Sequence, residues 1–141
     1  MSNKKKILIL CTGNSARSQM VEGLLKHIAS NEYEVFSAGT NPSSVRVEAI
    51  QALREIGIDI SQNRSKSVDE FADAKIDYIL TVCDSAKENC PYFPARIKVI
   101  HHSFDDPAAV DGTDAEKLDA FRHVRDEIQK YLAEDFVKNI G

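Results

Sequence analysis

The chain has 141 residues, of which 43% are hydrophobic and 28% are charged, and its formal net charge at pH 7 is -4. These values are typical of one soluble globular domain, here residues 1–141, that buries a core without disulfide bonds. A negatively charged chain has no global basic field to attract nucleic acid or an anionic membrane, so an anion-binding site in it must be local.

The first apolar segment, residues 7–10, is too short for the hydrophobic region of a secretory signal. No other segment reaches the roughly 20 apolar residues that cross a bilayer. We therefore expect a cytoplasmic protein with no membrane partner. In that compartment the three cysteines, Cys11, Cys83 and Cys90, favour catalytic, redox or metal-binding roles over structural disulfides.

Predicted strands and helices alternate along the chain. In order, we expect a strand at residues 7–10, a helix from near Ser18 to near Asn31, a strand at 34–37, a helix at 47–56 ended by Gly57, a short helix at 68–74, a strand at 77–82, a helical turn or two within 84–90, a strand at 97–100, a loop at 104–111 and a long amphipathic helix at 115–137.

This alternation predicts an α/β fold with a four-stranded parallel sheet, right-handed crossovers and helices on both faces. Ligands of such sheets bind beyond the carboxyl ends of the strands. Cys11, Cys83 and the loop that contains Asp106 each follow a predicted strand. We therefore expect these three segments to converge at one edge of the sheet.

The segment from Cys11 to Ser18 has the features of a site for a tetrahedral oxyanion. Backbone N–H groups in a tight loop form a concave anion site, and the following helix adds the positive end of its dipole. Arg17 can hold two oxygens with its planar guanidinium, and Gly13 permits backbone conformations closed to other residues. Asn14 is expected to brace the loop through side-chain hydrogen bonds. The same field favours the thiolate of Cys11 as a nucleophile, whereas the alternative is a buried cysteine before an ordinary turn.

Residues 11–18 resemble the phosphate-binding loop of the low-molecular-weight protein tyrosine phosphatase superfamily, and nearly the whole chain shares the resemblance. Four further motifs resemble the thioredoxin-coupled class of arsenate reductases within it: Ser18-Gln19-Met20, Ser37-Ala38-Gly39, Thr81-Val82-Cys83 with Asn89-Cys90-Pro91, and Phe104-Asp105-Asp106-Pro107. The resemblance implies that the oxyanion is bound by Thr12, Gly13, Asn14, Ser15, Ala16, Arg17 and Ser18.

The same resemblance implies a thiol relay. Cys11 attacks arsenate, Cys83 attacks Cys11 to release arsenite, and Cys90 then moves the disulfide to Cys83. A thioredoxin or glutaredoxin restores the thiols, so neither a bound cofactor nor a metal is expected. In a helix the last two cysteines would lie about 10.5 Å apart along the axis, too far for a disulfide, so the segment between them must unwind.

Two other roles remain open for the cysteine pair. Cys83 and Cys90 are alternatively small core residues, or they bind zinc together with His101 and His102. Zinc is disfavoured because the cysteine spacing is wide and because adjacent histidines on a strand point to opposite faces.

The proton donor implied by the resemblance is Asp106, which directly precedes Pro107. The proline restricts the aspartate to extended conformations and so helps to fix its direction. Asp105 is the adjacent alternative, and a solvated turn is the interpretation without catalysis.

Some relatives hold a potassium ion behind the loop, with ligands that map to Asn14, Glu22 and Ser37. A further acidic ligand aligns with Lys66, and we hypothesise that its ammonium group replaces the ion; the alternative is a solvated surface lysine. Related reductases often have a second cysteine in the loop, where this chain has Ala16, but the relay does not use it.

The main functional expectation is arsenate reduction, with phosphate or sulfate as competing oxyanions and the protein as a monomer. The alternative is a tyrosine phosphatase that uses Cys11, Arg17 and Asp106 through a phosphocysteine. Such phosphatases usually have an aromatic residue after the Asp-Pro pair, but this chain has Ala108 and Ala109 there and no tryptophan at all. We therefore expect weak residual phosphatase activity at most; a third possibility is a non-catalytic oxyanion or redox sensor.

Overall fold

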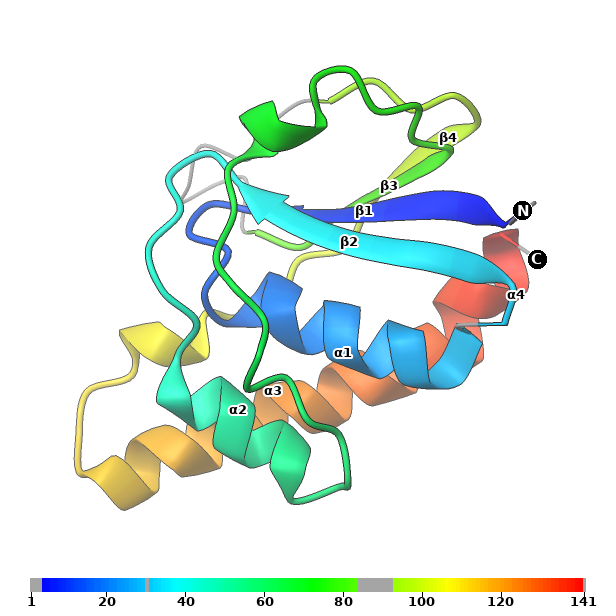
Figure 1. Ribbon diagram of the computed structural model, residues 1–141. Helices are drawn as coiled ribbons and strands as arrows, with labels where there is room; N and C mark the ends of the chain where they lie inside the picture. Colours follow the sequence, from blue (N-terminus) through cyan, green and yellow to red (C-terminus); the bar gives the residue numbers. More distant parts are fainter. Residues whose placement is uncertain (1–3, 30, 84–92, 141) are drawn as a thin grey trace.

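A computed structural model of the chain describes residues 4–29, 31–83 and 93–140 (Figure 1). Its four strands pair in the order β2-β1-β3-β4, and all three pairings are parallel. The strands are β1 (Lys5–Cys11), β2 (Tyr33–Gly39), β3 (Tyr78–Thr81) and β4 (Lys98–His101). The predicted four-stranded parallel sheet with helices is confirmed.

Strand β1 lies in the middle of the sheet and is buried on both faces. Residues 7–10 are all 0% exposed. Ile7 and Ile9 belong to one hydrophobic cluster, whereas Leu8 and Leu10 belong to the cluster on the opposite face. The unbroken apolar run in the sequence therefore reflects burial on both faces rather than a helix.

The described α-helices all lie on one side of the sheet, below it in Figure 1. They are α1 (Arg17–Ala29), α2 (Val47–Arg54), α3 (Asp114–Tyr131) and the short α4 (Val137–Ile140). On the other face the described helical cover is a 3-10 turn, η1 (Val68–Phe71), whose Phe71 ring lies 5.6 Å from that of Phe36. This turn is shorter than the predicted 68–74 helix, and the helical turns predicted within 84–90 lie outside the described residues.

The last predicted helix, 115–137, differs from the structure. Helix α3 begins after Thr113, whose side chain forms a capping box with Glu116, and ends at Tyr131. A π-helical turn, η3 (Leu132–Phe136), follows and leads into α4. The buried residues at this end of the chain are spaced four apart. In an α-helix, four residues turn by about 40° more than one full turn, so each buried side chain would be rotated away from the one before it. The wider π-helical turn removes this rotation and keeps the buried side chains on one face. These residues are Ile128, Leu132, Phe136 and Ile140.

Two helices end as follows. In α1, Ile28 is 38% exposed, and Ala29 is the last buried residue. Helix α2 ends at Arg54, two residues before the predicted end, and Gly57 follows with a φ of +84°, as expected of a glycine that ends a helix. In the part of the chain that the structure describes, no helix is long and apolar enough to span a bilayer.

Candidate active site

The oxyanion loop, defined here as residues 12–18, connects the buried strand β1 to helix α1. Cys11 is the last residue of β1, and Arg17 is the first residue of α1. The loop lies at the carboxyl ends of the strands, at the left of Figure 1, and η2 (Pro107–Ala109) lies at the same end of the molecule. The sheet thus brings Cys11 and the Asp106 loop together, as expected for a parallel sheet.

The backbone carbonyls of residues 12–16 all accept hydrogen bonds from the surrounding chain. Their donors, in order, are Asn41 N to Thr12 (2.9 Å), Ser43 N (3.2 Å) and Ser65 Oγ (2.9 Å) to Gly13, Gln19 Nε2 to Asn14 (3.1 Å), Arg46 N to Ser15 (2.9 Å) and Met20 N to Ala16 (3.0 Å).

These bonds determine which way the amides point. None of the described peptide bonds is cis, and in a trans peptide the carbonyl of one residue points opposite to the N–H of the next. With the carbonyls of residues 12–16 turned outward, the N–H groups of residues 13–17 point to the inner side of the loop. Together with the N-terminus of α1, they form a concave site for an anion.

Asn14, rather than Gly13, adopts the left-handed conformation that the loop requires, with a φ of +47°. Asparagine tolerates this conformation because its short polar side chain bonds locally. Its Nδ2 donates to Ser18 Oγ (2.8 Å) and Ser37 Oγ (3.0 Å), and its Oδ1 accepts from Lys66 N (2.8 Å). The predicted bracing by Asn14 is therefore present, but the conformational role assigned to Gly13 was wrong.

Two residues that shape the loop were not identified as such from the sequence. A Cβ at Gly39 would meet the Thr12 carbonyl oxygen at an impossible distance and the Cys11 carbonyl at 2.9 Å, so only glycine fits there. Gln19 is 0% exposed, and its Nε2 lies within hydrogen-bond distance of Asn14 and of the Arg64 carbonyl. The sequence signals that point to them are a glycine at the end of a strand and an amide side chain among the apolar residues of a helix.

The nucleophile candidate Cys11 is a free thiol and is 2% exposed. Its Sγ lies 3.0 Å from Ser18 Oγ. Because Asn14 already donates to that hydroxyl oxygen, the Ser18 hydrogen is available to the sulfur. Such a donor stabilises negative charge on the sulfur.

Arg17 and Asp106 face each other across the mouth of the loop. Arg17 is 4% exposed, and its Nη1 donates to the Phe104 carbonyl at 3.3 Å. Its Nη2 lies 3.7 Å from Asp106 Oδ2, and Asp106 Oδ1 accepts from Ala108 N at 3.0 Å. Asp106 has the extended backbone expected before a proline, with φ -79° and ψ 106°. Asp105 is exposed, so of the two aspartates it is Asp106 that the structure places against Arg17.

Cys83 lies one strand away from Cys11. Val82 N donates to the Leu10 carbonyl at 2.9 Å, which sets the ends of β1 and β3 side by side, about 5 Å apart. Cys83 is 0% exposed and belongs to the same hydrophobic cluster as Cys11. It is disulfide-bonded, whereas Cys11 is free. The remaining cysteine, Cys90, lies outside the described residues.

The zinc alternative finds no support in the described part of the chain. His101 Nδ1 lies 2.6 Å from Thr81 Oγ1, whereas the His102 ring stacks on Tyr131. No group of three or more metal-binding side chains is found within residues 4–29, 31–83 and 93–140.

Lys66 is not a solvated surface lysine. Its side chain is 13% exposed, and its Nζ donates to the Arg64 carbonyl at 3.0 Å and lies 3.8 Å from Glu22 Oε1. Burial lowers the pKa of Lys66, and the Glu22 charge opposes that shift. Glu22 also accepts a hydrogen bond from Ser37 Oγ at 2.7 Å. Lys66 therefore lies beside two of the residues to which the potassium ligands of relatives map, Glu22 and Ser37.

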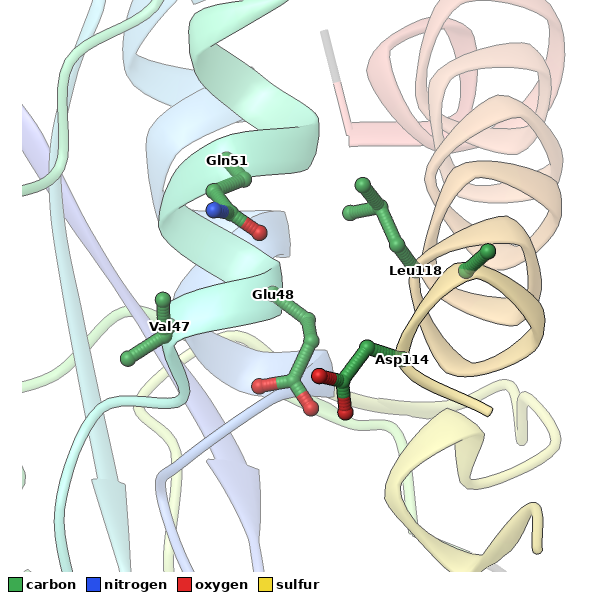
Figure 2. Close-up of a pocket in the computed structure, with 6 residues that line it drawn as sticks. Val47, Glu48, Gln51, Asp114 and Leu118 are labelled. Atoms are coloured by element: carbon green, nitrogen blue, oxygen red, sulfur yellow. The ribbon is translucent and has the colours of Figure 1, made fainter. Parts of the chain in front are cut away.

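A separate cavity of about 440 Å³ lies between α2 and α3 (Figure 2). The carboxylates of Glu48 and Asp114 point toward each other at its mouth. Arg46 Nη2 pairs with Glu48 at 3.1 Å, but the second carboxylate leaves the mouth negative overall, so this cavity does not compete with the loop as an anion site.

Comparisons with known proteins agree with this geometry. The model of the low molecular weight phosphotyrosine protein phosphatase family matches residues 6–140. A protein named arsenate reductase from Halalkalibacterium halodurans is 48% identical over 130 residues, which are 92% of this chain and 94% of that protein. The arsenate reductase of Bacillus subtilis is 43% identical over the same shares. A solved structure described as an arsenate reductase in the phosphate binding state superposes with a TM-score of 0.78 at 28% identity and covers 97% of this chain and 99% of that one.

Proposed function

The chain belongs to the low molecular weight phosphotyrosine protein phosphatase family, and we propose that within it the protein reduces arsenate to arsenite through a three-cysteine relay. One observation supports this most directly. Cys11 is a free thiol under an anion-binding loop, while Cys83, at the end of the neighbouring strand, is already oxidised to a disulfide. A phosphatase needs the first of these features but not the second.

The first step joins sulfur to arsenic. The inward amides of the loop and Arg17 bind arsenate with its central atom over Cys11 Sγ. The thiolate attacks arsenic, an As–S bond forms, and an As–O bond breaks. Asp106 gives its proton to the departing oxygen, which leaves as water.

The next steps supply two electrons. A Cys83 thiolate attacks Cys11 Sγ, the S–As bond breaks, and its electron pair stays with arsenic, which leaves as arsenite. The product is a Cys11–Cys83 disulfide. Cys90 then attacks Cys83 and releases Cys11 as a thiolate, ready for the next arsenate. The free thiol of Cys11 beside the disulfide-bonded Cys83 supports this order of exchanges.

The cycle requires an external dithiol to reduce Cys83 again. We propose a thioredoxin- or glutaredoxin-type protein as this reductant, no bound cofactor or metal, and a monomer acting in the cytoplasm. Phosphate and sulfate have the same tetrahedral shape as arsenate and would compete for the loop.

A tyrosine phosphatase would use the same Cys11, Arg17 and Asp106. The relatives of 43–48% identity are named arsenate reductases, which favours reduction as the main activity. Because phosphate and arsenate are nearly isosteric, we propose weak ester cleavage as a side activity.

The test is arsenate-dependent NADPH oxidation coupled through thioredoxin and thioredoxin reductase, for the wild type, Cys83→Ser and Cys90→Ser. We expect sustained turnover from the wild type alone. Hydrolysis of p-nitrophenyl phosphate is the matched control, because both serine variants keep Cys11, Arg17 and Asp106 and should retain it.

Two outcomes would count against this proposal, and a third would identify the reductant. Full turnover by Cys83→Ser would refute the relay. If the wild type turns over only with glutaredoxin and glutathione, the reductant is of the glutaredoxin type and the relay stands. If it turns over with neither, and each molecule is oxidised only once, the protein is a sensor rather than a reductase.

A further inference from the structure

Three aromatic side chains form a stack beside the site, and none of the steps above uses them. The His102 ring lies flat on Tyr131, with centroids 3.8 Å apart and planes 21° apart. The Phe104 ring lies 4.8 Å from His102 and meets Tyr131 edge-on at 5.9 Å. We call these three residues the aromatic stack. Burial lowers the pKa of His102.

The backbone of the stack connects β3 to Arg17. Beyond the end of β4, His102 N donates to the Thr81 carbonyl at 2.9 Å, and Phe104 N donates to the Val82 carbonyl at 3.2 Å. The Phe104 carbonyl then accepts from Arg17 Nη1 at 3.3 Å. The orientation of Arg17 therefore depends on where Phe104 lies.

The side chains of the stack also hold Phe104 in that position. The segment between β4 and η2 has no regular structure, yet Phe104 within it is only 4% exposed. Tyr131, the last residue of α3, packs on both other rings, and Phe136 of the π turn lies behind it with centroids 6.2 Å apart. The segment is thus held on one side by its two backbone hydrogen bonds to the β3 end and on the other by packing against the end of α3.

We propose that Tyr131 and His102 are positioning residues for the oxyanion site: they clamp Phe104 so that its carbonyl holds the Arg17 guanidinium ready for an anion. Asp106 follows Phe104 by two residues, so the same clamp fixes the start of its loop. A role of these residues in arsenate reduction rests on the proposed function, whereas their role in anion binding does not.

The size of the effect follows from ordering Arg17. An arginine that must be ordered during binding weakens that binding by about two- to tenfold relative to one that is already held. A held guanidinium also keeps its remaining donors directed at the anion, which matters because their geometry is planar and fixed.

The experiment measures binding of inorganic phosphate by titration calorimetry to the wild type, Tyr131→Leu, Tyr131→Phe and Phe71→Leu. Tyr131→Leu removes the stacking ring, and we expect phosphate to bind about two- to tenfold more weakly. Tyr131→Phe keeps the ring and should bind within about twofold of the wild type. Phe71 packs on Phe36 on the other face of the sheet, so Phe71→Leu should lower stability without changing phosphate affinity.

The readouts separate this role from a merely structural one. Dithiothreitol should reduce the Cys83 disulfide at the same rate in all four proteins, because that step does not use Arg17. If Tyr131→Leu does not fold, His102→Leu removes the other half of the stacked pair and should weaken phosphate binding in the same way.

Unchanged phosphate affinity in a folded Tyr131→Leu or His102→Leu would overturn the proposal, as would an equal loss in Phe71→Leu. A wild type that binds phosphate but reduces no arsenate would refute the proposed function and leave this inference intact. A wild type that binds no phosphate would overturn the oxyanion site itself.

Discussion

Glu22 is an unusual residue to find behind an anion site. Its carboxylate is buried, 4% exposed, and accepts hydrogen bonds from Ser37 Oγ (2.7 Å) and Asn63 Nδ2 (3.1 Å). A buried negative charge there would repel a bound oxyanion unless it were neutralised. Lys26 Nζ at 3.1 Å and Lys66 Nζ at 3.8 Å supply the compensating charge.

The position of Lys66 predicts that the wild type needs no potassium. We expect its kcat/KM for arsenate to change less than about twofold when potassium chloride replaces tetramethylammonium chloride, because an ammonium already lies beside Glu22. Lys66→Gln removes that charge and should lower the free energy of unfolding by about 1–3 kcal/mol. Urea denaturation measures the loss, and potassium should restore part of it.

The matched control is Lys75→Gln, which removes an exposed lysine and should leave both stability and potassium response unchanged. Strong stimulation of the wild type by potassium would contradict the hypothesis.

At the scale of residues, the sequence predicts the chemistry of the site better than its shape. Cys11 and Arg17 are recognisable because their side chains do the chemistry and lie on one continuous loop. Gly39 is needed because a Cβ there would run into the Thr12 carbonyl, and the left-handed Asn14 is held by Ser37 and Lys66. The requirements for a glycine at 39 and for a left-handed residue at 14 come from contacts between distant segments, and local sequence patterns do not reveal such contacts.

Among the elements, α2 and α3 are joined by a polar clamp. Glu55, just after α2, accepts from Arg122 Nη2 at 2.6 Å and from Arg125 Nη1 at 2.8 Å. Arg125 Nη1 also donates to the Ala52 carbonyl at 2.8 Å. Hydrogen bonds from Arg122, and next from Arg125, lower the pKa of Glu55 to about 2.

This shift predicts a pH-dependent contribution to stability. The pKa of Glu55 is depressed on folding, so its contribution is fully present above the unfolded value of about 4.5 and is lost as pH falls through about 2. We expect Glu55→Gln to unfold more easily than the wild type at pH 7, with the difference shrinking between about pH 5 and pH 2. Urea denaturation across this range measures it.

High salt should also reduce that difference, because the carboxylate is partly exposed and its ion pairs are screened. A difference that stayed constant down to pH 2 would show that Glu55 acts by packing rather than by charge.

The order and type of the elements follow from periodicity, but their ends do not. The predicted sheet is confirmed. It could be predicted because a parallel strand that is buried on both faces leaves an unbroken apolar run in the sequence, as residues 7–10 do. The division of the last helix into α3, the π turn and α4 was not predicted. The apolar stripe indicated a helix. The π turn, in contrast, forms because buried residues spaced four apart must all face the core, and this requirement is visible only in the packed structure.

On the scale of the whole molecule, the oxyanion loop is held by segments from most of the chain. Its carbonyls and side chains bond to residues 37–46 and 65–66, and Arg17 bonds to residues 104–106. Unfolding separates these segments, so the unfolded chain has no anion site. Binding of an anion is therefore linked to the stability of the entire fold.

This linkage predicts that phosphate raises the melting temperature of the wild type. At a concentration of 100 times Kd, a ligand that binds only the folded state adds about 2.7 kcal/mol, which is on the order of 8 °C for a domain of this size. Arg17→Lys keeps the charge but cannot hold both the Phe104 carbonyl and two anion oxygens, so its Kd should rise about tenfold. At the same phosphate concentration, phosphate would stabilise this variant by about 1.4 kcal/mol, so its melting temperature would rise by roughly half as much as that of the wild type. Differential scanning calorimetry in phosphate, compared with chloride of equal ionic strength, measures the shift in melting temperature of both proteins. Equal shifts in the two salts would mean that phosphate acts by general screening and not through the loop.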